Sequence, residues 1–302
     1  MAVVLAFLLT AACGQPDLIG KEGPIPGDGG SWAENSKKAR WVTIGDFGNG
    51  SVDQKAVADA MCAHREAEAF DHIVTTGDNI YPEGETKDFS KKFFVPYDCL
   101  LNKGVRFHSV LGNHDIKNPW AGLSQVEEPI FGFNGEPYYK WTLGPVTFIM
   151  LNSQSLDTEL DSVEGTGKQY EWMLDEIAKA QDDPWTVVVL HDPVFSTGEK
   201  HPSTPDFDEQ LGVPFSENGV DLVLSGHDHN YQHAEVDGVT YIVTGGGGAA
   251  IYPCQEPFIE PVDECLEEHH FVEVEADPTS MSITAISPDE LTLDSVVIDK
   301  NP

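Results

Sequence analysis

Short apolar runs recur along the chain from residue 41 onward, and each ends on a cluster of polar residues. The runs are WVTI (41–44) before GDFG, HIVTT (72–76) before GDNIY, VRFHSVL (105–111) before GNHD, TVVVL (186–190) before HDP, and VDLVL (220–224) before SGHDH. Apolar, β-rich runs of this length that end at turn residues are typical of buried strands. We therefore predict five strands, each followed by a polar loop.

Other segments have different periodicities. Residues 52–70 and 168–181 carry apolar side chains at helical spacing. Hairpins are predicted over 138–151, over 233–244 around Asp237-Gly238, and over 271–286. Strands alternating with helices, followed by hairpins, predict an α/β fold with mixed sheets. Ligands in such folds bind beyond the carboxyl ends of the strands, which is where all five polar clusters lie.

The N-terminal residues 1–12 are almost wholly apolar, and the segment is shorter than the ~20 residues of a spanning helix. We predict a signal peptide here. Thr10 to Cys13 resembles a bacterial lipobox, in which Cys13 would carry a lipid anchor; an ordinary secretory signal is the alternative. Residues 13–38, rich in Gly and Pro, predict a flexible tether, and 39–302 a single catalytic domain. The expected location is exported, either as a cell-envelope lipoprotein or as a periplasmic or secreted protein.

Export permits disulfide bonds. Setting Cys13 aside, four of the 5 cysteines remain, and these allow three pairings. Cys254 and Cys265 bracket a loop rich in Pro and Glu and are the favoured pair, which leaves Cys62 with Cys99. No pair has CxxC spacing, and this argues against a structural zinc site.

Composition narrows the possible partners. The chain of 302 residues is 40% hydrophobic and 23% charged, as in an ordinary globular protein. The net charge is −34, from 17 Lys and Arg against 51 Asp and Glu. Nucleic-acid binding relies on clustered Lys and Arg, so the charge argues against a nucleic-acid partner and against adhesion to anionic lipid. The charge is interpreted as a solubilising surface.

The five polar clusters supply oxygen and nitrogen donors of mixed type. They contain Asp46; Asp78 and Tyr81; Asn113, His114 and Asp115; His191; and His227 and His229. A single aspartate after a strand is most often a turn former or helix cap, and a single histidine is most often a hydrogen-bonded residue. Oxygen and nitrogen donors that converge at one edge of a sheet are what a divalent or trivalent metal site requires. Two ions about 3.5–4 Å apart, bridged by Asp78, fit the number of donors better than one.

The motifs GD-x-G, GDN-x-Y, GNHD, H-x-P and GHDH, in this order, resemble those of the purple acid phosphatases in the calcineurin-like metallophosphoesterase superfamily. The small, tartrate-resistant form is the most similar, and the resemblance covers nearly all of 40–302. It implies a four-layer sandwich of two mixed β-sheets flanked by helices. It also implies a dinuclear metal centre.

The resemblance assigns ligands to both ions. An Fe(III) site would use Asp46, Asp78, Tyr81 and His229. A site for Fe(II), Zn or Mn would use Asp78, Asn113, His191 and His227. His114 would be catalytic, and Asn113, His114 and His201 would contact the substrate. The sequence departs from the family pattern at Asp192 within HDP and in a short loop after GNHD, which leaves substrate choice open.

Gly48 bears on the role of Tyr81. Many metallophosphoesterases have a metal-binding histidine two residues after the first aspartate, where this chain has Gly48. Another donor is then needed, and Tyr81 stands at the matching place in the family pattern. The free phenol has a pKa of about 10, but Fe(III) would favour the phenolate, whose charge transfer would colour the protein.

The function that these features predict is an exported acid phosphatase. It would hydrolyse small phosphomonoesters by attack of a metal-bound hydroxide, and His114 would assist the leaving group. One alternative is a phosphodiesterase or nucleotidase using the same site; another is a non-catalytic binding or adhesion protein on the same fold. Neither a G-x-S-x-G elbow nor a P-loop offers competing chemistry.

Overall fold

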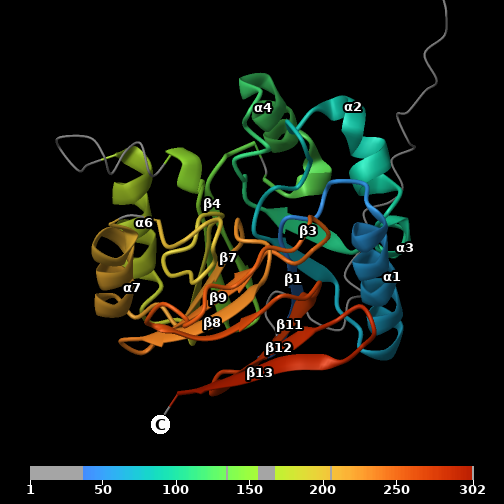
Figure 1. Cartoon of the computed structure of the whole chain (residues 1–302). Helices are drawn as coiled ribbons and strands as arrows, with labels where there is room; N and C mark the ends of the chain where they lie inside the picture. The colour runs from blue at the N-terminus through green and yellow to red at the C-terminus, as the bar shows by residue number, and fades with distance from the viewer. Residues whose placement is uncertain (1–36, 134, 156–166, 205, 301–302) are drawn as a thin grey trace, which may run out of the picture.

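The computed structural model describes residues 37–133, 135–155, 167–204 and 206–300. The predicted signal peptide and Cys13 lie outside these residues, as does the predicted tether apart from residues 37 and 38. Within the described residues the strands form two sheets, one with six strands and one with seven. The helices flank them, with α1 on one side of the molecule and α6 and α7 on the other (Figure 1).

The first sheet has the strand order β13-β12-β11-β1-β2-β3 and is mixed. Strands β1 to β3, which form one half of the sheet with β3 at its edge, run parallel, whereas β11, β12 and β13 pair antiparallel. The strands span Ala39–Ile44 (β1), His72–Thr75 (β2), Arg106–Ser109 (β3), Phe271–Ala276 (β11), Ser280–Ile286 (β12) and Thr292–Asp299 (β13).

The second sheet has the order β10-β8-β9-β7-β6-β5-β4. Strands β5, β6, β7 and β9 run parallel, and β4, β8 and β10 pair antiparallel. They span Tyr139–Leu143 (β4), Val146–Met150 (β5), Trp185–Val189 (β6), Leu222–Ser225 (β7), Tyr231–Val236 (β8), Val239–Thr244 (β9) and Val262–Leu266 (β10).

The helices are mostly short. They span Val52–Ala67 (α1), Thr86–Phe89 (α2), Asp98–Leu101 (α3), Pro119–Glu127 (α4), Lys168–Lys179 (α6) and Val213–Glu217 (α7). One 3₁₀ turn (Pro129–Phe131) and two π turns (Ser90–Phe94 and Asp208–Gly212) accompany them. The longest helix, α1, begins where the Ser51 side chain accepts a hydrogen bond from the Gln54 amide, an N-cap that satisfies an otherwise unpaired donor.

The main hydrophobic core lies between the two sheets. Trp41 of β1 packs edge-on against Phe148 of β5, with ring centroids 5.0 Å apart at 81°, so a side chain of each sheet meets there. Both are fully buried, as are Val57 and Met61 on the inner side of α1. Burying each such side chain stabilises the fold by about 1.5–3 kcal/mol. This packing holds the two sheets together and so fixes the relative positions of their strand ends.

The fold confirms the predicted class of two mixed sheets flanked by helices. The five predicted strands correspond to β1, β2, β3, β6 and β7, and the predicted helices to α1 and α6. The three predicted hairpins are β4–β5, β8–β9 and β11–β12.

Two disulfides join the four predicted cysteines. Cys62 of α1 bonds to Cys99 of α3, and Cys254 bonds to Cys265 of β10, which confirms the predicted pairing. Disulfides persist in oxidising compartments, so the pairing indicates an extracytoplasmic protein. Among the described residues, no helix has the length and apolar character needed to cross a membrane.

Candidate metal centre

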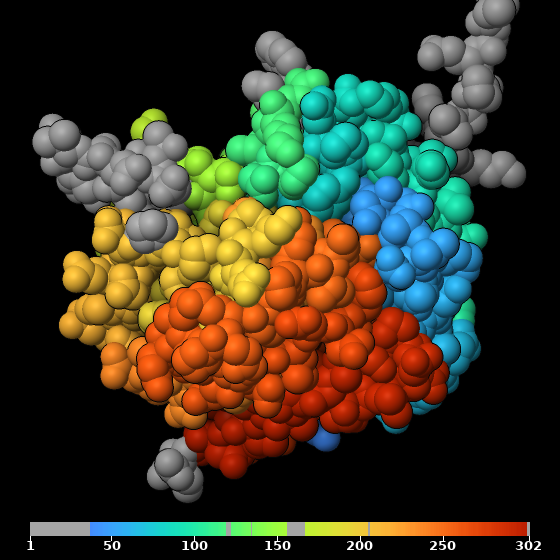
Figure 2. All heavy atoms as spheres, viewed as in Figure 1, coloured from blue at the N-terminus to red at the C-terminus, as the bar shows by residue number. Residues whose placement is uncertain are grey.

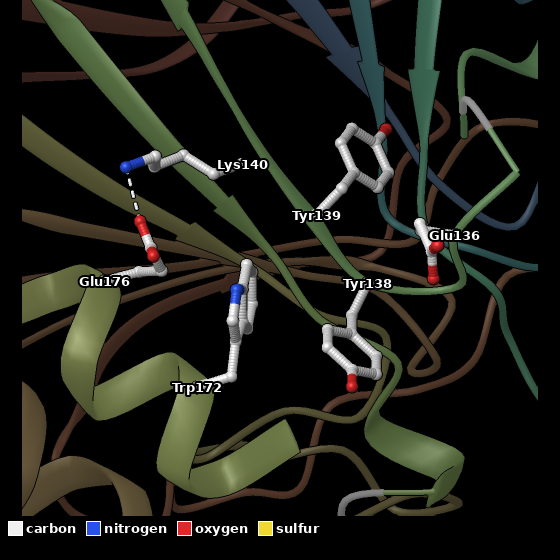
Figure 3. Close-up of a pocket in the computed structure, with 6 residues that line it drawn as sticks. All are labelled: Glu136, Tyr138, Tyr139, Lys140, Trp172 and Glu176. Carbon is white, nitrogen blue, oxygen red and sulfur yellow. Dashed lines mark ion pairs between the residues drawn. The ribbon is translucent and has the colours of Figure 1, made fainter. Parts of the chain in front are cut away.

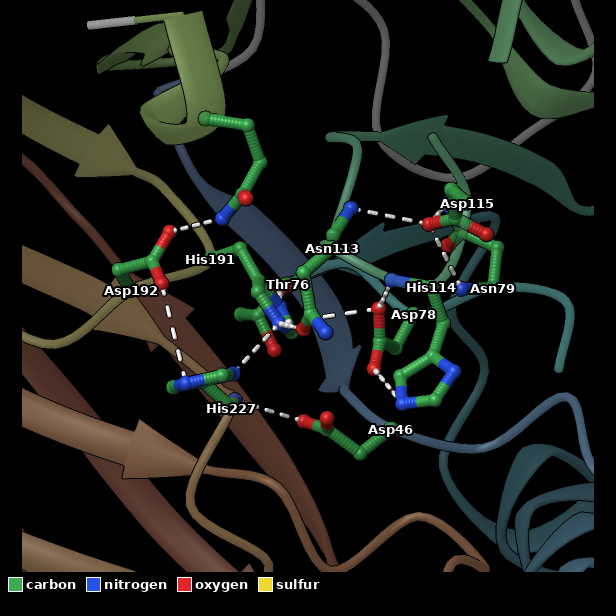
Figure 4. Close-up of polar contacts among 12 residues, drawn as sticks. Asp46, Thr76, Asp78, Asn79, Asn113, His114, Asp115, His191, Asp192 and His227 are labelled. Atoms are coloured by element: carbon green, nitrogen blue, oxygen red, sulfur yellow. Dashed lines mark hydrogen bonds and ion pairs between the residues drawn. The ribbon is translucent and has the colours of Figure 1, made fainter. Parts of the chain in front are cut away.

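Strand ends from both sheets meet at a buried cluster of Asp46, Asp78 and His191. Asp46 follows β1, Asp78 follows β2 and His191 follows β6, and their potential ligand atoms all lie within 4.8 Å of one another. All three are buried, and Figure 4 shows Asp78 and His191 with the side chains around them. Carboxylate and imidazole atoms gathered in this way can hold a metal ion.

The backbone at three of the motif positions is left-handed. The φ angles are 55° at Asp46, 50° at Asp78 and 68° at His227, a region that residues other than glycine seldom adopt. Each residue directly follows a glycine after a strand, so the chain turns sharply there. Strained backbone of this kind occurs at functional sites, where the surrounding packing maintains it.

One side of the cluster contains the predicted ligands of the second ion. The Nε2 atom of His191 lies 3.1 Å from Oδ1 of Asn113 and 3.7 Å from Oδ1 of Asp78. Nδ1 of His227 lies 3.1 Å from the same His191 nitrogen. The structure therefore brings all four predicted donors of this set together (Figure 4).

The other side contains the predicted ligands of the ferric ion. The Tyr81 hydroxyl donates a hydrogen bond to Oδ1 of Asp46 at 3.2 Å and lies 3.1 Å from Nε2 of His229. That histidine nitrogen lies 3.4 Å from Oδ1 of Asp46. Burial, with the charges of Asp46 and Asp78, raises the pKa of the Tyr81 phenol well above its usual value.

The GHDH loop directs its two histidines to opposite sides of the cluster. His227 contacts His191, whereas His229 contacts Asp46 and Tyr81. Between them, Asp228 is buried and its Oδ2 accepts hydrogen bonds from Asn230 and Gln232. The left-handed turn at His227 and this buried carboxylate separate the two imidazoles, which an extended strand would present on one face.

Two of the histidines are oriented by backbone carbonyls. Nδ1 of His191 lies 2.8 Å from the Thr76 carbonyl oxygen, and Nδ1 of His229 lies 2.9 Å from the Ala250 carbonyl oxygen. A carbonyl oxygen can only accept a hydrogen bond, so each Nδ1 carries a proton, and Nε2 is the nitrogen that faces the cluster and would bind a metal ion in its deprotonated form. This arrangement is typical of metal-binding histidines.

The charges of the cluster also fit a cation. Burial, with the charges of Asp46 and Asp115, raises the pKa of Asp78 to about 7. Although burial opposes it, the charges of Asp78, Asp46 and Asp192 raise the pKa of His191 to about 9. Within the described residues the ion pairs of Asp46 and Asp78 are with histidines. Buried carboxylates need compensating positive charge, which a bound metal ion would supply.

Gly48 lies where the loops after β1 and β2 touch. A Cβ atom at this position would lie 1.6 Å from the backbone oxygen of Asn79, so no side chain fits. The Tyr81 amide donates a hydrogen bond to the Gly48 carbonyl oxygen at 2.8 Å. The glycine thus permits the close approach that holds the Tyr81 loop against the first motif.

The predicted substrate residues border the cluster. The His114 amide donates to Oδ1 of Asp78 at 2.8 Å, and its partly exposed ring has Nε2 4.0 Å from Oδ2 of the same carboxylate. His201, also partly exposed, packs against His227 with ring centroids 3.9 Å apart. Burial, helped by the charge of Lys117, lowers the pKa of His114.

Some contributors to the site carried no assigned role in the sequence analysis. Asp115 is buried and accepts from the amides of Asn79, Ile80 and Gly112, so it fastens the second and third motif loops together. The position of Asp115 within the GNHD motif is a sequence signal from which its role could have been predicted. Tyr252 stacks on His229, with centroids 4.0 Å apart at 14°. It lies in an irregular loop, where periodicity gives no signal.

The described residues also form a groove of about 360 Å³ that shares no residue with this cluster. It is lined by Glu136, Tyr138, Tyr139, Lys140, Trp172 and Glu176 (Figure 3). An ion pair joins Lys140 to Glu176, and Tyr138 packs on Trp172 at 5.0 Å. Because the groove brings no imidazole near its carboxylates, the cluster around Asp78 is the candidate metal centre.

Comparisons with known proteins agree with this geometry. A family model described as calcineurin-like phosphoesterase matches residues 39–231. Purple acid phosphatase 17 of Arabidopsis thaliana is 29% identical over 252 residues, covering 72% of this chain and 70% of that protein. The structure of purple acid phosphatase PPD1 from yellow lupin superposes with a TM-score of 0.74 at 19% identity, covering 89% of this chain and 55% of the lupin chain. GAP50, the anchor in the inner membrane complex of Plasmodium, superposes with a TM-score of 0.75 at 17% identity, covering 88% and 90% of the two chains.

Proposed function

The chain belongs to the calcineurin-like phosphoesterase family, and on that premise we propose that it is an acid phosphatase that hydrolyses small phosphomonoesters at a dinuclear metal centre. The main support is the arrangement of seven donors in two sets that share Asp78. One set gathers around His191 and the other around Asp46. The similarity to purple acid phosphatases favours a monoesterase over other family activities.

We assign ligands to both ions. Asp46, Asp78, Tyr81 and His229 would hold Fe(III). Asp78, Asn113, His191 and His227 would hold Fe(II), Zn or Mn. Bound ions would lower the pKa of a coordinated water and neutralise charge on the phosphoryl oxygens.

His114 is the proposed proton donor to the leaving oxygen. Its ring lies at the partly exposed edge of the centre, and its backbone is fixed by the hydrogen bond to Asp78. Nδ1 lies 2.8 Å from the Pro82 carbonyl oxygen and 3.0 Å from the Lys117 ammonium. Nε2 faces the Asp78 carboxylate and is the nitrogen that would exchange a proton with the substrate. Because burial lowers the pKa of His114, its doubly protonated form is favoured in acidic solution.

The substrate would lie between His114 and His201, with Asn113 beside it. His201 packs on His227, and Lys200 lies over the Tyr252 ring at 4.6 Å. In a chain with a net charge of −34, Lys117 and Lys200 provide local positive charge beside the centre. Such cations favour the approach of an anionic phosphate ester.

We also propose that the protein acts outside the cytoplasm, anchored through a lipid on Cys13. The two disulfides and the apolar residues 1–12 support export. Incorporation of labelled palmitate during expression in bacteria, lost in Cys13→Ser, is the expected result. Equal labelling of both forms would refute the anchor.

Parallel turnover of p-nitrophenyl phosphate and bis(p-nitrophenyl) phosphate tests the activity. We expect preference for the monoester, about two metal ions per chain by elemental analysis, and loss of activity after chelation. Asn113→Ala and His191→Ala should lose metal and activity together. Preference for the diester would support the phosphodiesterase alternative. A folded chain with neither bound metal nor turnover would support a non-catalytic role.

A further inference from the structure

The three histidines of the candidate centre differ in what their second ring nitrogen faces. His191 and His229 each direct Nδ1 to a backbone carbonyl, as described above. His227 directs Nδ1 into the cluster, toward His191. Its other nitrogen, Nε2, faces the Asp192 carboxylate, with 3.9 Å to Oδ1 (Figure 4). His227 is therefore the one of these three whose outer nitrogen faces a charged side chain.

Asp192 is itself held in place by two side chains that follow β5. Its Oδ2 accepts hydrogen bonds from Ser153 Oγ at 2.5 Å and from Gln154 Nε2. The Asp192 amide donates back to Ser153 Oγ at 3.2 Å. These contacts occupy Oδ2 and leave Oδ1 directed at His227.

The Asp192 carboxylate forms its ion pair with a histidine of the cluster. The Asp192 side chain is 17% exposed, and its ion pair within the described part of the chain is with His227. The 3.9 Å separation is within ion-pair range but longer than a hydrogen bond. A small rotation of the imidazole would bring the two atoms to hydrogen-bond distance. The opposite restraint comes from His201, whose ring packs on that of His227 at 43°.

We propose that Asp192 is a positioning residue for metal binding. In the metal-bound protein its carboxylate would accept the Nε2–H of His227 and so keep the Nδ1 lone pair of His227 directed into the cluster, on the side of His191. A carboxylate behind a ligating imidazole fixes its tautomer and makes it a stronger ligand. The inference rests on the proposed metal centre, and it gives a role to the residue at which the HDP motif departs from the family pattern.

The test uses the whole apoprotein titrated with Zn²⁺ in a calorimeter, so it does not depend on catalysis. We expect Asp192→Asn to weaken one of two Zn²⁺ equivalents about 10–100-fold and to leave the other unchanged. Asp183→Asn is the matched control, because Asp183 accepts a hydrogen bond from Thr147 away from the centre. It should bind both equivalents as the wild type does.

A double-mutant cycle separates positioning from general loosening of the fold. In a His227→Ala background, Asp192→Asn should cause no further loss of Zn²⁺ affinity, because the side chain that it orients is gone. The same loss in both backgrounds, or wild-type affinity in Asp192→Asn alone, would overturn the proposal. If Asp192→Asn does not fold, Ser153→Ala combined with Gln154→Ala carries the test. This variant removes both hydrogen bonds to Oδ2 but keeps the charge of Asp192, and unchanged affinity there would also overturn the proposal.

Phosphatase assays run in parallel distinguish a failure of this inference from a failure of the proposed function. A wild-type protein that binds two Zn²⁺ ions and shows the expected cycle, but turns over no phosphomonoester with any metal, refutes the function and leaves the role of Asp192 supported. A wild-type protein that binds fewer than two ions refutes both. Full activity together with additive effects in the cycle refutes the role of Asp192 alone.

Discussion

The amide of Tyr81 and the carbonyl oxygen of Gly48 are joined by a 2.8 Å hydrogen bond that ties the loop after β2 to the loop after β1. The same Gly48 leaves no space for a side chain, since a Cβ would meet the Asn79 backbone at 1.6 Å. The phenol that this contact positions lies 3.2 Å from Asp46 and 3.1 Å from His229. Gly48 provides no metal-binding side chain in the first motif, and its lack of a side chain lets the loop that carries Tyr81, a second possible ligand, approach closely.

Gly48→Ala should destabilise the protein by about 3 kcal/mol or more, because the added methyl group meets rigid backbone rather than a flexible side chain. Denaturant unfolding measures the change. Gly212→Ala is the control, since its Cβ would have its nearest neighbours at 3.6 Å and should cost far less. Equal stability of the two variants would contradict the close approach.

Tyr81→Phe should abolish a visible absorption band of the iron-loaded protein while leaving the fold intact. Burial, with the charges of Asp46 and Asp78, raises the pKa of Tyr81 well above its usual value, so without metal the phenol keeps its proton. Only a strongly acidic cation would favour the phenolate. Spectra of the apoprotein and the iron-loaded protein test this, and a colourless, active, fully iron-loaded wild type would refute it.

The strands and the site residues were predictable for different reasons. A buried strand such as β6 (Trp185–Val189) is apolar throughout and ends at a polar cluster, so periodicity alone finds it. The assignment of Tyr81 and His229 to one ion came from the resemblance of ordered motifs. The structure places those two side chains together, with the Tyr81 hydroxyl 3.1 Å from Nε2 of His229; their binding of one ion stays a prediction.

The features that could not be predicted from the sequence depend on tertiary contacts. Helices α2 and α3 have four residues each, about one turn, which is too short to show a period. The contact of Asp192 with Ser153 joins residues 39 apart in the chain. Tyr252 meets His229 because an irregular loop folds back on the GHDH motif. No local sequence pattern predicts contacts between residues that are distant in the chain.

The metal-free protein should lose stability between pH 7 and pH 9. The pKa of His191 is raised to about 9 from an ordinary 6.5, so in this range the folded state retains a proton that the unfolded state releases. Stability from this group is complete below about pH 6.5 and is lost as the pH rises through 9. Below that window, the lowered pKa values of His72 and His270, each about 4 because of burial, act in the opposite direction.

Thermal unfolding at pH 7, 8 and 9 measures this dependence. The midpoint of the apoprotein should fall with pH, and His191→Ala should flatten the slope. Saturating Zn²⁺ should remove or reverse it, because metal ions bind deprotonated ligands. A slope that is the same in the wild type and His191→Ala would contradict the assigned proton.

The two disulfides should differ in what their removal affects. Cys254–Cys265 closes 11 residues and Cys62–Cys99 closes 37, so chain entropy predicts losses of about 3 and about 4 kcal/mol respectively. The Gly198 segment pairs with Cys254, and the Glu199 amide donates to the Pro253 carbonyl. In Figure 2 the yellow segment before residue 205 lies against the orange segment near residue 250.

This pairing connects the Cys254–Cys265 bond to the proposed substrate side. Tyr252 and His201 lie on the two paired segments, and their rings are 5.5 Å apart. Cys254→Ser with Cys265→Ser should therefore raise KM for p-nitrophenyl phosphate several-fold with a smaller change in kcat. Cys62→Ser with Cys99→Ser should lower the unfolding midpoint at least as much but leave KM unchanged, because α1 meets this loop at its N-terminus, where the Ser51 hydroxyl donates to the Gly248 carbonyl oxygen, and Cys62 lies in its C-terminal half. Equal KM values in the two double variants would show that the disulfide at Cys254 does not organise the substrate side.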